Sequence, residues 1–599
     1  MAEESAPGPD SAPDARRVLT GALRHSRART AALCLLNTAS AVAAVLLPAA
    51  LGHALDLVLA DAGGTGGTGG TGGAGHTGPA TGLAAAVTLC AVLLCAEVAL
   101  DALVALTGGT TTARTTAWLR RRGIEHLLAT APHRAADRFT PGDLVTRLTG
   151  NAAETGTAPT TAATGLAALL TPLGGLVALA LTDLWLALVF VTGLPLLALL
   201  LRAFARGSAD SVSRYQQVQA EIATRLVEAL GGARTIAAAG SAARERRRVL
   251  EPLPELDAQG RRMWHVYGRA VVGSTILVPL LTTAVLAVGG VRLASGGLSV
   301  GELLAASRYA ALAAGLGGVL GVLNSLVRSR SAARRGAELL ALPRVGHGAR
   351  TLPADGPGRL ELRAVTVRRG GETALHGIDL VVPGGTTMAV VGRSGAGKSL
   401  LAAVAGRLTD PDEGCVLLDG VPLPDLDAAE LRREVGYAFE RPALFGDTVG
   451  AAMAFGPYAP TGREVGAAAH AAGADTFVAL LPQGPRTPLA DAPLSGGELQ
   501  RLGLARAFAH AGRLLVLDDA TSSLDSVTEL HVGRALAHDV RPGTRLLIAH
   551  RVSAAARADL VAWLDGGRVR AVGPHALLWE DPAYRAVFDH EGTAGAPWR

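Results

Sequence analysis

The stretch VGRSGAGKSL, residues 391–400, indicates the fold class of the C-terminal part of the chain. Residues 392–399 fit the pattern GxxxxGK[ST], in which backbone N–H groups close around phosphate oxygens at the start of a helix. The motif requires a strand before it and a helix after it, and here it lies between the apolar run TMAVV and SLLAAVAGRL. The stretch therefore predicts a phosphate-binding loop in a strand–helix fold.

Lys398 in this loop is the only lysine of the chain, although Lys and Arg together number 56. Arginine at every other basic position is consistent with the codon bias of a GC-rich genome. An ammonium is a compact point charge, whereas a guanidinium is a planar fork. We therefore interpret Lys398 as the cation that reaches the phosphates from inside a tight loop, where arginine would not fit.

The first half of the chain carries long apolar runs. The 599 residues are 49% hydrophobic and only 18% charged, too apolar for an ordinary soluble protein. A bilayer-spanning helix needs about 20 apolar residues. Six runs meet this need: 31–59, 82–106, 163–183, 185–204, 268–291 and 303–326.

Arginine between these runs alternates in density. The lead-in and the second, fourth and last connections are rich in Arg, whereas the GGT-repeat loop around 63–73 has none and the segment 291–302 has only Arg292. Because positive loops stay in the cytoplasm, both termini are predicted to be cytoplasmic, in a multi-pass protein of the cell membrane. The four cysteines form no CxxC pair and predict neither a disulfide framework nor a zinc site.

The pattern divides the chain into four segments. Residues 1–30 are a cytoplasmic lead-in, 31–340 a six-helix membrane domain, 341–358 a Pro/Gly linker, and 359–599 a soluble domain with alternating strand and helix patterns. The predicted fold class is a membrane α-helical domain of six helices fused to an α/β nucleotide-binding domain with a P-loop. Thr182, Asp183 and Leu184 predict a tight hairpin between the third and fourth runs.

Further motifs follow the phosphate loop in a fixed order. They are LSGGE at 494–498, LLVLDDATSSLD at 514–525, and His550 at the end of RLLIAH. With these motifs the chain resembles the ATP-binding-cassette (ABC) transporters, and in particular half-transporters of exporter layout. In the first half, FTPGDLVTRL (139–148), EALGGARTIAAAG (228–240) and LSVGELLAASRY (298–309) are similar to the cytoplasmic connections and the start of the sixth helix of that family.

The resemblance implies a role for each motif residue. Asp518 and Ser399 would hold Mg²⁺, Asp525 would lie at the seam of a dimer, and His550 would sense the γ-phosphate. Ser495, Gly496 and Gly497 would contact the γ-phosphate of ATP bound on the opposite subunit. The phosphate-binding residues would be Gly392, Arg393, Ser394, Gly395, Ala396, Gly397, Lys398 and Ser399.

Three positions depart from the family pattern. Asp519 stands where a glutamate normally polarises the attacking water, and Glu440 stands where a glutamine normally meets Mg²⁺ and water. Arg369 stands where an aromatic side chain normally stacks on adenine, although a guanidinium also stacks on a base. All three belong to the ATP site of this chain's own phosphate loop, whereas LSGGE is intact. This combination favours a heterodimer with one weakened ATP site, and a slowly hydrolysing homodimer is the alternative.

The sequence thus predicts one subunit of an ATP-driven exporter of a small amphipathic molecule or a modified peptide. Its predicted partners are a second half-transporter, the bilayer and the substrate, without nucleic acid. Alternatives are an importer of a siderophore-like ligand, a homodimeric drug or lipid exporter, and a membrane ATP sensor. The apolar runs argue against a soluble ABC ATPase. Glu97 and Asp101 either face a cationic substrate or lie in cytoplasmic water.

Overall fold

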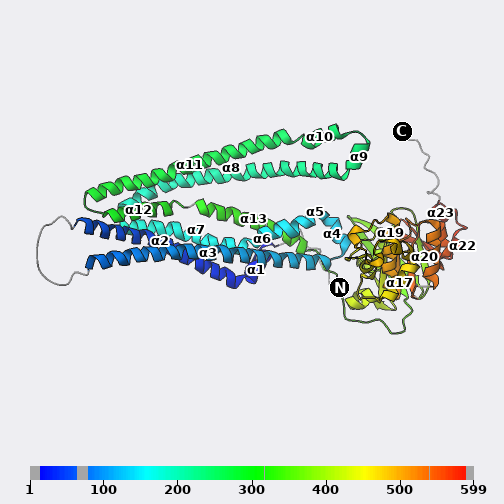
Figure 1. Cartoon of the computed structure of the whole chain (residues 1–599). Coiled ribbons are helices and arrows are strands. Elements are labelled where there is room, and N and C mark those ends of the chain that lie inside the picture. Colours follow the sequence, from blue (N-terminus) through cyan, green and yellow to red (C-terminus); the bar gives the residue numbers. More distant parts are fainter. Residues whose placement is uncertain (1–13, 64–77, 316, 539, 542, 589–599) are drawn as a thin grey trace, which may run out of the picture. The chain divides into compact units, whose positions relative to one another are not determined.

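The computed structural model describes residues 14–63, 78–315, 317–538, 540–541 and 543–588 (Figure 1). The GGT repeat and the first part of the lead-in lie outside the described residues. The chain divides into two compact units. One comprises 1–125 and 141–341, and the other comprises 126–140 and 342–599.

The first unit is built from helices. Its elements are α1 (Ala15–His25), α2 (Arg27–Gly63), α3 (Gly78–Leu128), α5 (Pro141–Thr146), the π-turn η2 (Arg147–Asn151), α6 (Ala152–Gly156), α7 (Ala158–Thr182), α8 (Leu184–Gly231), α9 (Ala233–Ala238), α10 (Ala242–Leu250), α11 (Leu253–Ala294), α12 (Val300–Ala313) and α13 (Gly317–Leu340).

Small residues allow these helices to pack closely. Helix α8 packs along α11, α2 along α7, and α12 against both α2 and α7. Where α2 crosses α12, a Cβ atom on Gly52 would lie 2.5 Å from the carbonyl oxygen of Gly301. At this crossing, Asp56 accepts hydrogen bonds from the Ser299 hydroxyl at 2.5 Å and from the Gly301 N–H at 2.8 Å. Close glycine contacts of this kind are typical of helix packing in a bilayer.

The predicted hairpin between the third and fourth runs is confirmed. Helix α7 ends at Thr182 and α8 begins at Leu184. Asp183 between them caps α8, because its carboxylate accepts from the N–H groups of Trp185 and Leu186 at 2.8 and 3.4 Å. The same buried carboxylate pairs with Arg292 at 2.8 Å.

The sixth run is not the single helix that was predicted. Helix α12 ends at Ala313, Ala314 and Gly315 form a turn, and α13 begins at Gly317. Glycine lowers helix stability by about 1 kcal/mol relative to alanine. The glycines at 315, 317 and 318 therefore account for a break that an apolar count could not detect.

Three helical stretches of the described residues are long and apolar enough to cross a membrane: Arg27–Ala60, Gly82–Leu128 and Pro141–Thr182. Two shorter apolar stretches, Leu184–Pro195 of α8 and Val278–Ala294 of α11, correspond to parts of the fourth and fifth predicted runs.

The second unit contains two sheets. The smaller sheet has the order β2-β1-β4-β5 and the larger one β10-β9-β3-β8-β7-β6. The strands are β1 (Leu360–Arg369), β2 (Glu372–Val382), β3 (Thr387–Val391), β4 (Glu413–Leu418), β5 (Val421–Pro422), β6 (Val435–Phe439), β7 (Leu514–Asp518), β8 (Thr544–Ile548), β9 (Leu560–Asp565) and β10 (Arg568–Gly573).

Helices flank these sheets. They are α14 (Lys398–Ala405), α15 (Ala428–Glu434), α16 (Val449–Ala454), α17 (Gly462–Ala471), α18 (Asp475–Leu480), α19 (Gly496–Ala509), α20 (Ser526–His538), α21 (Val552–Arg557), α22 (His575–Leu578) and α23 (Pro582–Arg585), with the 3-10 turns η3 (Leu423–Asp425), η4 (Gly484–Arg486) and η5 (Leu489–Asp491).

In the larger sheet β9, β3, β8, β7 and β6 run parallel, and only β10 is antiparallel to its neighbour. Parallel strands leave their carboxyl ends at one edge, where α/β folds bind ligands.

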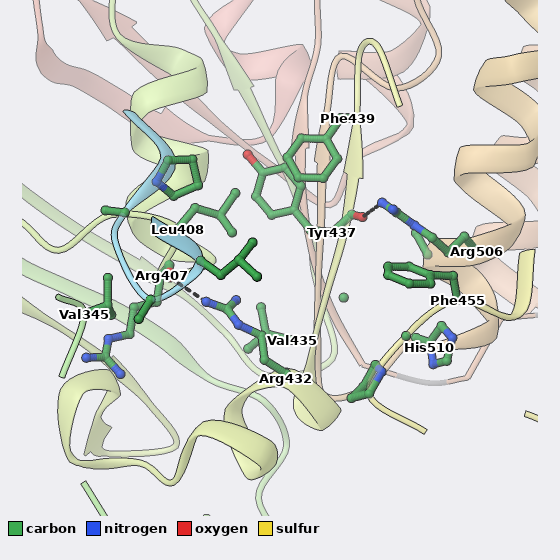
Figure 2. A pocket seen from close by; sticks show the side chains of 18 of the residues that line it. Val345, Arg407, Leu408, Arg432, Val435, Tyr437, Phe439, Phe455, Arg506 and His510 are labelled. Carbon is green, nitrogen blue, oxygen red and sulfur yellow. Dashed lines mark hydrogen bonds between the residues drawn. The ribbon is translucent and has the colours of Figure 1, made fainter. Parts of the chain in front are cut away.

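Residues 126–140 of the helical half belong to the second unit. The Val345 N–H donates to the Ala129 carbonyl at 2.8 Å, and α4 (Pro132–Arg138) follows this contact. A cavity of about 660 Å³ lies between residues 128–132 and the residues around β6 and α19 (Figure 2). Two of its lining side chains, Tyr437 and Phe439, come from β6 itself.

Candidate nucleotide-binding site

The strand register brings four motifs to one edge of the larger sheet. Val390 of β3 pairs with Ile548 of β8, and Phe439 of β6 pairs with Asp518 of β7. Each strand is followed directly by motif residues, so the phosphate loop, Glu440, Asp519 and His550 all follow carboxyl ends at this edge. Topology alone therefore assembles residues more than 150 positions apart.

The phosphate loop has the backbone that its glycines allow. Gly395 and Gly397 have φ of 81° and 95°, in the left-handed region that favours glycine. Gly392 has no room for a side chain, because a Cβ atom there would lie 2.2 Å from the Leu564 carbonyl oxygen. The loop ends at Lys398, the first residue of α14, so its N–H groups lie at a helix N-terminus.

Lys398 lies within its own loop. It is 6% exposed, and its Nζ donates to the carbonyl oxygens of Gly392 at 2.8 Å and Arg393 at 3.1 Å. Burial lowers the pKa of Lys398, while the carboxylates of Asp519 and Asp518 act in the opposite direction. A phosphate group in this loop would replace two neutral carbonyl partners by charged oxygens.

Asp518 at the end of β7 has an unsatisfied carboxylate oxygen. Its Oδ1 is buried without a hydrogen-bond partner among the described residues, and its Oδ2 accepts from the Tyr437 hydroxyl at 3.3 Å. Burial raises the pKa of Asp518, while the hydroxyls of Ser399 and Tyr437 lower it and Glu440 raises it. A buried oxygen without a partner beside a serine hydroxyl fits Mg²⁺, which takes few protein oxygens and several from phosphate and water.

Asp519 has a backbone conformation that is uncommon for its type, with φ of 51°. Its carboxylate oxygen Oδ2 lies 3.9 Å from Nε2 of His550. Burial raises the pKa of Asp519; His550 lowers it, and the charge of Glu440 raises it. The structure thus places both His550 and Glu440 within electrostatic range of Asp519.

The signature segment begins a helix. Ser495 caps α19: its hydroxyl accepts from the Glu498 N–H at 3.4 Å, and Glu498 accepts from the Ser495 N–H at 2.7 Å. This capping box leaves Gly496 and Gly497 in the first turn of α19. Among the described residues beyond its chain neighbours and its own helix backbone, nothing lies within 4 Å of a Cβ atom built at Gly496, and a Cβ atom at Gly497 would lie 3.3 Å from the Ser523 carbonyl oxygen.

Gln500 is a residue whose role the motifs did not predict. It is 3% exposed, and its Nε2 donates to the Glu440 carbonyl oxygen at 2.8 Å and to the Ser522 hydroxyl at 3.0 Å. Its Oε1 accepts from the Ser523 N–H at 3.0 Å. Gln500 therefore ties α19 to the loop after β6 and to the loop after β7. Its place two residues after LSGGE was the only available signal.

Asp525 is exposed and caps α20. Its carboxylate accepts from the Thr528 hydroxyl at 2.7 Å and from the N–H groups of Val527 and Thr528 at 3.0 Å. The Thr528 N–H lowers the pKa of Asp525, so the carboxylate is charged.

Arg369 at the end of β1 has an ionic partner. Its Nη2 lies 3.3 Å from Oδ1 of Asp137 in α4, and both side chains are about half exposed. This ion pair links the end of β1 to residues 126–140, and the stacking of Arg369 on adenine stays a prediction. Sequence separation hid this pair, because the two residues lie 232 positions apart.

A parallel sheet with a phosphate loop and adjacent carboxylates, in a chain with bilayer-length helices, defines a membrane-bound P-loop nucleoside triphosphatase. Residues 30–315 match the family model of the ABC transporter transmembrane region, and residues 375–522 match the family model named ABC transporter.

Similar proteins agree with these matches. The chain is 56% identical to "ABC transporter ATP-binding protein RamA" of Streptomyces coelicolor over 94% of this chain and 85% of the relative. It is 33% identical to an ATP-dependent lipid A-core flippase of Chromohalobacter salexigens over 78% of this chain and 82% of the relative. A solved bacterial Atm1-family ABC exporter with ATP bound aligns with a TM-score of 0.72 at 25% identity, over 96% of this chain and 99% of that one.

The chain belongs to the ABC transporters, as its motifs predicted, and has the exporter form in which a helical membrane domain is fused to a nucleotide-binding domain. It is a membrane ATPase coupled to transport, and exporters of this kind work as dimers. The importer and soluble-ATPase alternatives receive no support from these relatives.

Proposed function

We propose that this chain is one subunit of a heterodimeric exporter whose own ATP site hydrolyses slowly. The observation that carries this proposal is the contrast between an intact phosphate loop and the pair Asp519 and Glu440 beside it. The signature residues 494–498, which serve the opposite site, keep the family pattern.

The side-chain length at 519 supports a slow step. Aspartate is one methylene shorter than glutamate, so its carboxylate falls about 1 Å short of a water held in the usual place. A displacement of that size lowers a rate by about 100-fold. That factor corresponds to about 2.7 kcal/mol in the barrier.

The charge at 440 supports the same conclusion. Glutamate in place of a neutral amide adds a carboxylate whose charge raises the pKa of both Asp518 and Asp519. An additional anionic oxygen favours Mg²⁺ and disfavours the γ-phosphate in the same space. The site is therefore better suited to holding Mg²⁺-ATP than to cleaving it.

Each residue then has one task in the proposed cycle. Lys398 would exchange its carbonyl partners for phosphate oxygens, and Ser399, Asp518 and Glu440 would hold Mg²⁺. Mg²⁺ supplies charge neutralisation between the phosphates when it is bound. Asp519 would orient the attacking water weakly, and His550 would contact the γ-phosphate.

The substrate proposal is a small amphipathic molecule or a modified peptide. The predicted spans are dominated by Ala, Leu, Val, Gly and Thr, which favour an apolar or amphipathic cargo. Relatives named as a lipid A-core flippase and as a multidrug efflux protein of Mycobacterium tuberculosis support that class. The nucleotide-binding domain and both termini are proposed to be cytoplasmic and the helices to span the cell membrane.

The test is ATPase activity in lipid nanodiscs, with the chain alone and with a second half-transporter encoded beside it. We expect weak turnover alone, and turnover at least 10-fold higher for the pair. ATP-driven accumulation of a fluorescent amphiphile in inverted vesicles separates an exporter from an ATP sensor. Brisk turnover by the isolated chain would exclude the slow-site proposal, and absence of accumulation by the pair would favour the sensor.

A further inference from the structure

We propose that Tyr437 is a positioning residue for the Asp518 carboxylate, and this role rests on the proposed Mg²⁺ site. Tyr437 lies in the middle of β6. It belongs to none of the sequence motifs described above: the phosphate loop, the segment with Asp518 and Asp519, or the signature segment. Its hydroxyl donates to Oδ2 of Asp518 at 3.3 Å.

This hydrogen bond makes the two oxygens of Asp518 unequal. Oδ2 accepts from the Tyr437 hydroxyl, whereas Oδ1 is buried and makes no hydrogen bond to the described residues. The Ser399 hydroxyl, the other proposed metal ligand, lies close enough to the same carboxylate to lower its pKa. A carboxylate held at one oxygen keeps its other oxygen in a fixed direction. Ligands of metal ions are commonly oriented by such outer hydrogen bonds, whose loss weakens metal affinity. The arrangement assigns Oδ1 to the metal and Oδ2 to Tyr437.

The tyrosine ring is itself fixed by its neighbours. It lies 4.5 Å, centroid to centroid, from the Phe439 ring at an angle of 32° (Figure 2). Gly406 makes room for it, because a Cβ atom there would lie 2.8 Å from Cδ2 of the ring. The Tyr437 carbonyl oxygen accepts from Nη2 of Arg506 at 3.4 Å. Because these contacts fix the Tyr437 ring and its backbone, the hydroxyl has one position, beside Oδ2 of Asp518.

The same ring lines the cavity beside residues 128–132 (Figure 2). Tyr437 therefore contacts two features at once: the cavity through its ring and the Asp518 carboxylate through its hydroxyl.

The experiment measures how much Mg²⁺ strengthens ATP binding. The affinity of the purified full chain for a fluorescent ATP analogue is determined in excess Mg²⁺ and in EDTA, and the ratio of the two affinities is the metal-dependent gain. Tyr437→Phe removes only the hydroxyl. We expect it to lower the gain about three- to tenfold, the range for one ordinary hydrogen bond, because the distance of 3.3 Å is long, while affinity in EDTA stays the same.

A matched control is Tyr458→Phe. The Tyr458 hydroxyl donates to the Ala509 carbonyl oxygen at 3.2 Å in the same unit, without contact to Asp518. Its loss should leave the gain unchanged within twofold. Thermal unfolding of each variant checks that the unit is folded, and Tyr437→Leu removes the donor by a second route.

Asp518→Asn distinguishes a failure of the Tyr437 positioning role from a failure of the proposed Mg²⁺ site. If this variant loses the gain and both Tyr437 variants keep it, the positioning role is wrong and the metal site stands. If Asp518→Asn keeps the gain, the proposed metal site itself is wrong. A fall in affinity that is equal in Mg²⁺ and in EDTA for Tyr437→Phe would mean that the residue only supports the fold, which also overturns the inference.

Discussion

Two corners of the nucleotide-binding unit are built from different parts of the chain. The corner that we propose holds phosphate uses backbone: positive-φ glycines at 395 and 397, and loop carbonyls that hold Lys398. The corner that we propose activates water uses side-chain ends: the carboxylates of Asp519 and Glu440 and the imidazole of His550.

The comparison indicates which part of the site is more sensitive to amino-acid substitution. A backbone cradle depends on a few glycines and one cation, and every one of them is present. A corner made of side-chain ends depends on lengths and charges, and here one side chain is shorter and another is charged where the family has a neutral amide. Binding and hydrolysis can therefore change independently in a single site.

The largest effect is expected at Lys398. Lys398→Ala removes the buried cation of the loop, and loss of hydrogen bonds to charged oxygens of about 3 kcal/mol weakens ATP binding on the order of 100-fold. Lys398→Arg keeps the charge but should be nearly as weak, because a planar fork does not fit between the Gly392 and Arg393 carbonyls. ATP-analogue binding in nanodiscs measures both.

Membrane insertion and expression should not change in these variants. Arg463→Ala in the first turn of α17, where the side chain is exposed, serves as the control for loss of one cation. Near-normal ATP binding by Lys398→Arg would show that arginine fits in the loop and would contradict our explanation for the single lysine.

The second effect is a gain at Asp519. Asp519→Glu restores the missing methylene, and ATP turnover by the isolated chain should rise by up to about 100-fold. Because position 519 has φ of 51°, the longer side chain costs on the order of 1 kcal/mol in stability, visible as a small fall in Tm. The double variant Asp519→Glu, Glu440→Gln restores both side chains of the family pattern. If its ATP turnover equals that of the unmodified chain, these two residues do not limit hydrolysis.

A smaller effect is expected at Gln500, which joins the two corners. Gln500→Leu leaves the Glu440 carbonyl, the Ser522 hydroxyl and the Ser523 N–H without their partner. Each lost hydrogen bond at this partly buried position costs about 0.5–1.5 kcal/mol, so Tm should fall by several degrees and turnover by about 10-fold. Gln500→Glu, which keeps the acceptor, should keep the bond from Ser523 and lose less stability.

The smallest effect is expected for the pair Arg369 and Asp137. Both side chains are about half exposed, so solvent screening limits their interaction to less than about 1 kcal/mol. A double-mutant cycle of Arg369→Ala and Asp137→Ala on ATP affinity should give a coupling below fivefold that decreases with salt. A coupling that is insensitive to salt would mean that the two residues act through packing.

The strand-end motifs were predictable because each has a local pattern. Glycine spacing, an apolar strand and a following acid are short-range signals, and the parallel register then brought Asp518 and Phe439 side by side. The hairpin at Asp183 was predictable for the same reason.

Other features depend on contacts across the chain. The Arg369–Asp137 pair, the Gln500 bridge and the Tyr437 hydrogen bond join residues that no window of sequence contains together. The break after Ala313 was missed for another reason: an apolar count weighs hydrophobicity and ignores the helix-weakening effect of Gly315, Gly317 and Gly318.

The solitary lysine also makes the chain a natural reporter. A reagent that acylates amines has one ε-amine to find, Lys398, whose lowered pKa leaves more of it uncharged at mildly alkaline pH. Nucleotide in the loop shields that atom, so the fraction of labelled peptide reads the occupancy of this one pocket even within a two-pocket assembly. A lysine-specific protease would cut the unfolded chain after a single residue and would deliver that reading as one pair of fragments.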